Sequence, residues 1–167
     1  QGVIRSADVA QAPEIASLIM EAMDHDCFRN FAGPDHTLDD FRDMMTRLVA
    51  MDDSQYSYLN TLVAMVGDEV AGCLVAYDGK DLLRLRKRFV EEARRCLGRD
   101  FSSMDAETRA GEYYCDSLCV KTRFRKRGIA TKLISEVIRR HGTQPVGLLV
   151  DHTHPWAERL YRAIGFR

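Results

Sequence analysis

Apolar residues recur at helical spacing in two segments near the start of the chain. The first set follows intervals of three and four residues and consists of Ile15, Leu18, Ile19, Ala22 and Met23, with Pro13 in the expected first turn. The second set consists of Phe41, Met44, Met45, Leu48 and Val49. Thr37 precedes it as an expected N-cap, and Asp39 and Asp40 suit the positive end of a helix. We therefore expect two amphipathic helices after a short strand at residues 3–4.

The middle of the chain changes to continuous apolar runs at 62–66 and 70–77, joined by Gly67-Asp68-Glu69. This pattern predicts a β-hairpin with a glycine-containing turn. Residues 81–97 return to helical spacing through Leu82, Leu85, Phe89, Ala93 and Cys96, and Gly98 suits a helix C-cap. The run Arg84, Arg86, Lys87 and Arg88 falls between these positions, and we expect it to form a solvated face.

The last third alternates strands and helices. An apolar strand is expected at 112–120, then a basic loop at 122–128 and a helix that buries Ala130, Leu133, Ile134, Val137 and Ile138 and ends near residues 141–142. A strand at 146–150 and a helix from about Pro155 follow. The order of elements predicts an α+β fold, with a mixed sheet covered by helices, in a single domain without a linker or repeat.

Composition narrows the class of protein. The 167 residues are 46% hydrophobic and 29% charged with a net charge of -1, which fits a globular domain and predicts no general affinity for nucleic acid. No apolar run approaches the roughly 18 residues of a membrane span, and the N-terminus has no signal-peptide pattern. The five cysteines lie mostly in apolar segments, as buried reduced thiols do. We expect a cytoplasmic protein with no membrane partner.

The basic loop carries the clearest chemical signal. It reads Arg125-Lys126-Arg127-Gly128-Ile129-Ala130 and leads directly into a helix, whose first turn leaves N–H groups unpaired. Small residues there permit close approach of a ligand to the backbone. The pattern predicts a diphosphate-sized anion on the amides of residues 126–131. The alternative is an ordinary basic surface loop before a helix.

Two motifs in this region resemble those of the GNAT superfamily of N-acetyltransferases. The strand segment 116–120, followed by Arg-x-x-Gly-x-Ala at 125–130, is similar to the family's central motif. The late signature A-x-x-L-Y-x-x-x-G-F is matched by Ala157, Leu160, Tyr161, Gly165 and Phe166. The resemblance covers nearly the whole chain, 1–167. It implies the GNAT fold, whose mixed and mostly antiparallel central sheet is flanked by helices.

Two departures from the family concern the length of the chain. The helix at about 80–99 is longer than the usual connection there and is expected to be an insertion. The family usually continues past Gly165-Phe166 with one more strand, whereas this sequence stops at Arg167. Truncation and a strand supplied by a partner both stay open.

The resemblance implies acetyl-CoA as co-substrate and assigns residues to it. The backbone of Leu118, Cys119 and Val120 is expected to pair with the pantetheine arm. The pyrophosphate is expected on the loop made of Arg125, Lys126, Arg127, Gly128, Ile129, Ala130 and Thr131. His154 stands where the family often has an asparagine that contacts the cofactor. A replacement contact, a base and a plain loop histidine all stay open, and no metal is expected.

The same resemblance implies two catalytic roles. Tyr161 matches the tyrosine that protonates the departing CoA thiolate, and the alternative is a core tyrosine. A base must deprotonate the acceptor, and strand alternation places Glu112 and Asp116 on one face. A bulge would break that alternation, and Asp116 could instead serve a hydrogen bond within the structure. Cys115 and Cys119 alternate away from both acids, so we expect them to pack rather than to act as nucleophiles.

The function implied is transfer of an acetyl group to a primary amine by direct attack in a ternary complex. The acceptor is expected to be a small-molecule or peptide amine, and no nucleic acid is expected as a partner. The alternative is a non-catalytic acyl-CoA-binding regulatory module of the same fold. A homodimer is common among similar proteins and stays open here.

Overall fold

One sheet organises the part of the chain that the structure describes. The computed structural model describes residues 2–22, 37–98, 113–141 and 146–148. Within them the strands β1 (Val3–Ser6), β2 (Thr61–Val66), β3 (Glu69–Asp78), β4 (Tyr113–Val120) and β5 (Val146–Leu148) lie in the order β1-β2-β3-β4-β5. The first three pairings are antiparallel and β4 pairs with β5 in parallel. The predicted mixed, mostly antiparallel sheet is therefore confirmed.

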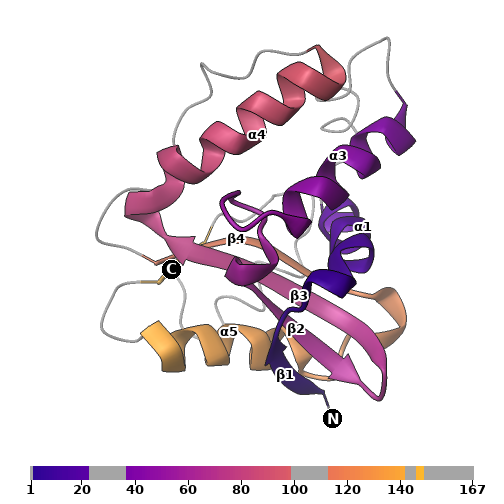
Figure 1. The fold of residues 1–167 in the computed structure, drawn as a ribbon. Helices are drawn as coiled ribbons and strands as arrows, with labels where there is room; N and C mark the ends of the chain where they lie inside the picture. Colours follow the sequence, from indigo (N-terminus) through magenta and orange to yellow (C-terminus); the bar gives the residue numbers. More distant parts are fainter. Residues whose placement is uncertain (1, 23–36, 99–112, 142–145, 149–167) are drawn as a thin grey trace.

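Helices cover both faces of this sheet (Figure 1). On one face lie α1 (Ala12–Ala22), α3 (Leu38–Ala50) and α4 (Leu82–Leu97), and on the other lies α5 (Ile129–His141). Short 3-10 helices at Val9–Gln11, Tyr58–Asn60, Gly79–Asp81 and Thr122–Phe124 lead into the larger elements. The helix expected from Pro155 falls outside the described residues. Among the described residues, no helix combines the length and apolarity that crossing a lipid bilayer requires.

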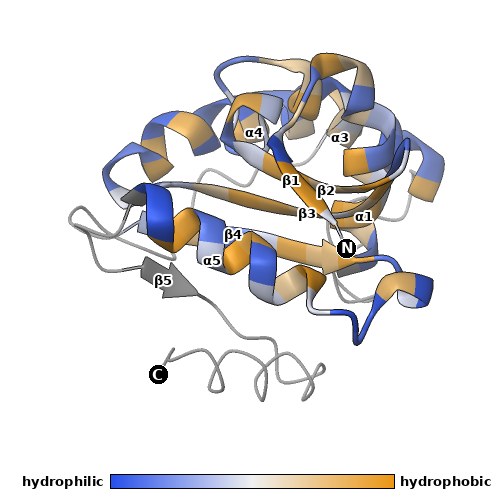
Figure 2. Cartoon of the chain, turned by 90° about the horizontal axis from the view of Figure 1, so that it is seen from below, coloured by the Kyte–Doolittle hydropathy of each residue, from blue (hydrophilic) through white to orange (hydrophobic). Residues whose placement is uncertain are grey.

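Alternation along β3 divides the buried side chains into two cores. Cys73, Val75 and Tyr77 pack under α1, α3 and α4, in what we call the α1/α3/α4 core. Leu74 and Ala76 point to the opposite side, in the α5 core. Figure 2 shows hydrophobic strands between the two helical layers, and α5 with both hydrophilic and hydrophobic turns. Because both faces of β3 are covered, its sequence is a continuous apolar run and not an alternating one.

Local signals in the sequence explain where these elements begin and end. Thr37 caps α3 as predicted, since its side chain accepts from the Asp40 amide at 3.2 Å while the Asp40 carboxylate accepts from the Thr37 amide at 2.9 Å. Gly98 ends α4 with a left-handed φ of 65°, the conformation expected of a C-cap. Gly67 turns the β2–β3 hairpin with φ 62°.

The charged run on α4 was predicted to be solvated, and this is wrong for Arg86, which is 5% exposed. Arg84 and Lys87 are exposed, but Arg88 is half-buried and pairs with Asp53 at 2.6 Å. Glu92 is also buried, and it pairs with Arg47 of α3 and with Arg95. The physical reason is that α4 lies against α3 and the segment after it. The buried side of α4 therefore includes charged residues as well as its apolar positions.

Candidate functional site

The turn between β4 and α5 has an unusual backbone. Lys126 and Gly128 both have left-handed conformations, with φ 65° and 78°. Glycine adopts this region without steric cost, whereas a lysine there is uncommon. The helix begins at Ile129, and the Lys132 amide donates to the Gly128 carbonyl oxygen at 3.0 Å. The amides of the first turn are therefore left without acceptors inside the helix, as anion binding requires.

Space above this turn is open. A Cβ atom built on Gly128 would meet no described atom within 4 Å, and the residue is exposed. Phe124 anchors the turn from below, since its side chain is 6% exposed in the α5 core. A ligand can therefore approach the backbone at Gly128 from solvent.

The basic residues around the turn differ in their partners. Arg123 pairs with Glu69, and the Lys121 ammonium lies 3.2 Å from the same carboxylate and 3.9 Å from Glu14. Lys126 and Arg127 are exposed, and neither has an acidic partner among the described residues. Lys126 and Arg127 therefore give the turn positive charge that no described acid balances.

Arg125 ties this turn to the end of β4. Its Nε donates to the carbonyl oxygen of Val120 at 3.1 Å. The side chain therefore folds back along the chain and does not simply extend the basic surface. The Val120 carbonyl, which was predicted to pair with pantetheine, already accepts this hydrogen bond.

The strand β4 offers backbone groups along one edge. Leu118, Cys119 and Val120 pair with Leu74, Cys73 and Gly72 of β3. On the other edge the described pairing with β5 covers Tyr113, Tyr114 and Cys115. Within the described residues, the stretch after Cys115 thus has a strand partner on the β3 side alone. An extended ligand can add to such an edge through backbone hydrogen bonds.

A β-bulge interrupts β4 at Asp116. Val75 lies opposite Ser117 and Ala76 lies opposite Cys115, so Asp116 is the extra residue. Its Oδ2 accepts a hydrogen bond from the Tyr77 hydroxyl at 2.6 Å. The same oxygen accepts from Gln55 Nε2 at 2.9 Å, and the Ser117 hydroxyl lies 3.4 Å from Oδ1. Asp116 therefore does form hydrogen bonds within the structure, which was one of the two alternatives.

The bulge also changes which cysteines face the acid. Cys115 lies in the α5 core, whereas Cys119 lies in the α1/α3/α4 core together with Tyr77, the partner of Asp116. The prediction that both cysteines point away from Asp116 is therefore wrong for Cys119. Simple alternation fails because the extra residue reverses the phase of the strand.

The environments of the buried thiols favour the protonated form over the thiolate. Burial raises the pKa of Cys115 to about 12 and, with a contribution from the nearby Glu21 carboxylate, the pKa of Cys119 to about 12. Burial likewise raises the pKa of the Cys73 thiol, with a contribution from Cys119. A nucleophilic cysteine reacts as the thiolate, which these environments disfavour.

Gln55, Tyr77 and Gly72 belong to this site but were not among the predicted site residues. A glycine inside an apolar strand run indicates that another backbone or a ligand approaches closely, and Gly72 occupies such a position in the sequence. Gln55 lies in a polar segment between two apolar elements, which gave no comparable signal.

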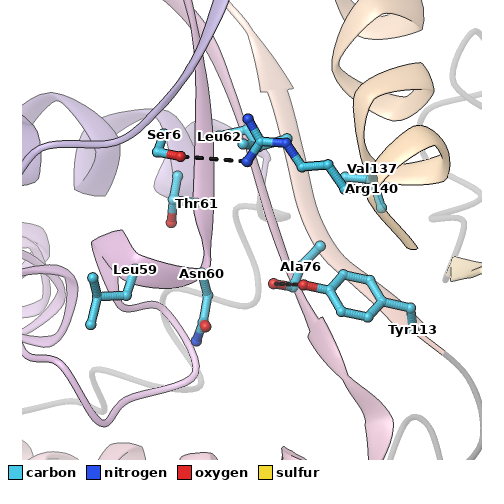
Figure 3. A pocket seen from close by; sticks show the side chains of 9 residues that line it. All are labelled: Ser6, Leu59, Asn60, Thr61, Leu62, Ala76, Tyr113, Val137 and Arg140. Carbon is cyan, nitrogen blue, oxygen red and sulfur yellow. Dashed lines mark hydrogen bonds between the residues drawn. The ribbon is translucent and has the colours of Figure 1, made fainter.

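A separate pocket lies on the α5 side of the sheet, with a volume of about 210 Å³ (Figure 3). It is lined by Ser6, Leu59, Asn60, Thr61, Leu62, Ala76, Tyr113, Val137 and Arg140. Arg140 donates to the Ser6 hydroxyl at 3.4 Å and Tyr113 donates to the Ala76 carbonyl at 3.4 Å. None of these nine residues was predicted as a site residue. The pocket lies near the last turn of α5, whereas the basic turn precedes its first.

Three predicted residues, Glu112, His154 and Tyr161, lie outside the described residues. Their roles stay predictions.

Comparison with known proteins places this arrangement in a family. An N-acetyltransferase from Staphylococcus aureus Mu50 has a similar structure, with a TM-score of 0.82, 25% sequence identity and coverage of 99% of this chain and 90% of that chain. A second acetyltransferase matches with a TM-score of 0.78 and 26% identity, covering 99% of this chain and 89% of that chain. An aminoglycoside N-acetyltransferase in complex with CoA shares the fold at 16% identity, with a TM-score of 0.56 over 100% of this chain and 88% of its own.

A search of curated proteins found no match. The sequence profile of the acetyltransferase (GNAT) family matches residues 18–166, which is most of the chain and includes the basic turn, the bulge and the late signature. The chain belongs to the GNAT acetyltransferase family.

Proposed function

We propose that the chain transfers the acetyl group of acetyl-CoA to a primary amine by direct attack within a ternary complex. The observation that carries the proposal is the turn at 125–128, with its two left-handed residues, its open surface and the first turn of α5 behind it. Such a turn suits a diphosphate in size and charge. Family membership supports an acyl-CoA as the donor.

The proposed donor site uses the turn and the neighbouring strand. The amides of residues 126–131 bind the pyrophosphate, and Lys126 and Arg127 supply positive charge. Backbone groups of Leu118, Cys119 and Val120 orient the pantetheine arm along β4, and His154 is proposed to lie beside the cofactor. The Arg125 bond to Val120 supports this site by holding the turn at the end of the strand.

The proposed chemistry moves three protons, two from the acceptor nitrogen and one to the sulfur of CoA. An amine with a pKa near ~10 arrives protonated, so Glu112 or Asp116 first takes a proton from it, directly or through water. The amine nitrogen then bonds to the carbonyl carbon of the thioester while the bond from that carbon to sulfur breaks. The acylated nitrogen carries one proton more than an amide does, and it releases this proton to solvent. Tyr161 gives a proton to the departing CoA thiolate. Exchange with solvent removes the proton from the base and returns one to the tyrosine.

The acceptor is proposed to be a small-molecule or peptide amine. A polyamine, an aminoglycoside, an amino acid and a peptide N-terminus or lysine are the classes to test. The buried free thiols Cys73, Cys115 and Cys119 suit a reducing compartment and support a cytoplasmic location.

Thermal unfolding with and without acetyl-CoA tests the donor site. At about 100 times Kd, binding adds about 2.7 kcal/mol of stability, which raises Tm by roughly 5–10 °C. Gly128→Asp places a carboxylate where the pyrophosphate is proposed and should abolish the shift. Gly67→Asp is the matched control, because Gly67 also has a left-handed φ and open space around it. A folded wild-type protein without any shift would contradict the proposal.

Turnover then separates an enzyme from a binding module. The amine classes are incubated with acetyl-CoA, and released CoA thiol is measured against a reaction without amine. Amine-dependent release supports the transferase. Binding of acetyl-CoA without release for any class would favour the regulatory module.

A further inference from the structure

Three polar side chains from separate parts of the chain meet at the bulge of β4. Tyr77 comes from β3 and Gln55 from the segment after α3, and both donate to Oδ2 of Asp116 at 2.6 and 2.9 Å. Tyr77 is 3% exposed and Gln55 is 5% exposed. The cluster therefore lies at the inner edge of the α1/α3/α4 core and not on the open surface.

Packing alone does not require this cluster. A buried amide or hydroxyl group costs stability unless it is hydrogen-bonded, whereas apolar side chains of similar size would fill the same space without that cost. Both donors bind the same carboxylate oxygen, which holds the carboxylate plane in one orientation. The 2.6 Å distance from the Tyr77 hydroxyl lies at the short end of the range for a hydrogen bond between two oxygens.

The segment that carries Gln55 is itself held at several points. The Ser54 hydroxyl donates to the Leu48 carbonyl at 2.5 Å, and the Asn60 side-chain Nδ2 donates to the Ser54 carbonyl at 3.2 Å. Asp53, on the other side of Ser54, pairs with Arg88 of α4 at 2.6 Å. The Gln55 amide is thus placed by its surroundings before any ligand binds, as a preorganised site requires.

The position of the cluster connects it to the donor site. Asp116 precedes by two residues the start of the β4 segment 118–120, along which the pantetheine arm is proposed to lie. Bulges redirect side chains and are frequent beside active sites. We infer that Tyr77 and Gln55 are positioning residues that hold the Asp116 carboxylate for the ammonium group of the acceptor, an inference that rests on the proposed acetyltransferase function.

The test compares Tyr77→Phe, Gln55→Leu and Asp116→Asn with wild type, using acetyl-CoA and an amine that the wild type acetylates. Tyr77→Phe and Gln55→Leu should each lower kcat about tenfold while KM for acetyl-CoA stays within about twofold. Tyr58→Phe is the matched control, because Tyr58 packs against the same core and is not one of the residues that hydrogen-bond to Asp116 in this cluster. It should leave kcat within about twofold. Circular dichroism and Tm confirm that each variant is folded.

A double-mutant cycle then distinguishes positioning from general support of the fold. If Tyr77 acts through Asp116, the double variant Tyr77→Phe/Asp116→Asn should be no slower than Asp116→Asn alone. Losses that multiply, or a Tyr77→Phe rate equal to that of Tyr58→Phe, would overturn the inference and leave the transferase standing. Absence of turnover by a wild type that binds acetyl-CoA would overturn the proposed function, and this inference with it.

Discussion

The carbonyl oxygen of Cys119 lies 2.8 Å from the position that a Cβ atom on Gly72 would take. Val120 crowds the same position, with its Cγ2 at 3.2 Å and its Cα at 3.3 Å. The first and the last of these atoms belong to the backbone, which cannot turn aside as the end of a side chain can. Gly72 therefore sets how closely β3 approaches the β4 segment proposed to hold the donor.

Gly72→Ala is expected to destabilise the protein by about 1–3 kcal/mol, because β3 and β4 must move apart. This corresponds to a fall in Tm of roughly 3–10 °C for a domain of this size. Thermal unfolding measures it. Gly2→Ala is the control, since the nearest atoms to its new Cβ lie at an ordinary 3.7 Å. Equal Tm values for the two variants would show that the strands have room for the methyl group.

The charges around the basic turn should contribute unequally to donor binding. Lys126→Gln is expected to weaken acetyl-CoA binding roughly tenfold and to reduce its salt dependence, because Lys126 has no acidic partner among the described residues. Arg123→Gln should have a smaller effect, since Glu69 already balances that charge. Isothermal titration calorimetry at two salt concentrations measures both. A larger loss for Arg123→Gln would contradict the proposed location of the phosphates.

The three buried thiols are expected to resist alkylation in the folded protein. Their pKa values are raised by burial, to about 12 for Cys115 and Cys119, so little thiolate forms at neutral pH. In a variant with Cys27→Ser and Cys96→Ser, maleimide should label no thiol rapidly under native conditions and three thiols after denaturation. Rapid native labelling of Cys115 or Cys119, mapped by mass spectrometry, would reopen a covalent route.

The ion pairs of Glu92 should give stability that depends on pH. Hydrogen bonding from Arg95 lowers the pKa of Glu92 below its ordinary 4.5, although burial opposes this. Its contribution is therefore present above that ordinary value and is lost as the pH falls through the lower folded value. Glu92→Gln should lower Tm clearly at about pH 7 and less at about pH 3.

Glu91→Gln is the control for this change, because Glu91 lies next in sequence but is exposed. Its effect on Tm should be small at both pH values. A Glu92→Gln deficit that stays constant with pH would mean that packing, and not charge, explains the loss.

The local pattern of apolar and polar residues in the sequence was sufficient to predict most of the described secondary structure. The apolar spacing predicted α1, α3, α4 and α5, and the hairpin at 62–77 is observed as β2 and β3 around Gly67. The caps at Thr37 and Gly98 follow from residue chemistry within one turn of the chain. The basic turn before α5 was also visible, because a helix N-terminus and its neighbours are adjacent in sequence. These features depend on contacts between near neighbours, which a sequence displays directly.

The site around Asp116 depended on the tertiary structure. Tyr77 and Gln55, which donate to Oδ2 of Asp116, lie 39 and 61 residues away along the chain, so no local pattern could assign them. The bulge, which reversed the expected facing of Cys119, arises from pairing with β3 and not from the sequence of β4 alone. Arg86 and Glu92 are likewise buried, and Glu92 pairs with Arg47 of the neighbouring helix α3. The sequence by itself determined the elements and the basic turn proposed to bind the pyrophosphate, whereas long-range packing decided which polar groups the elements bring together.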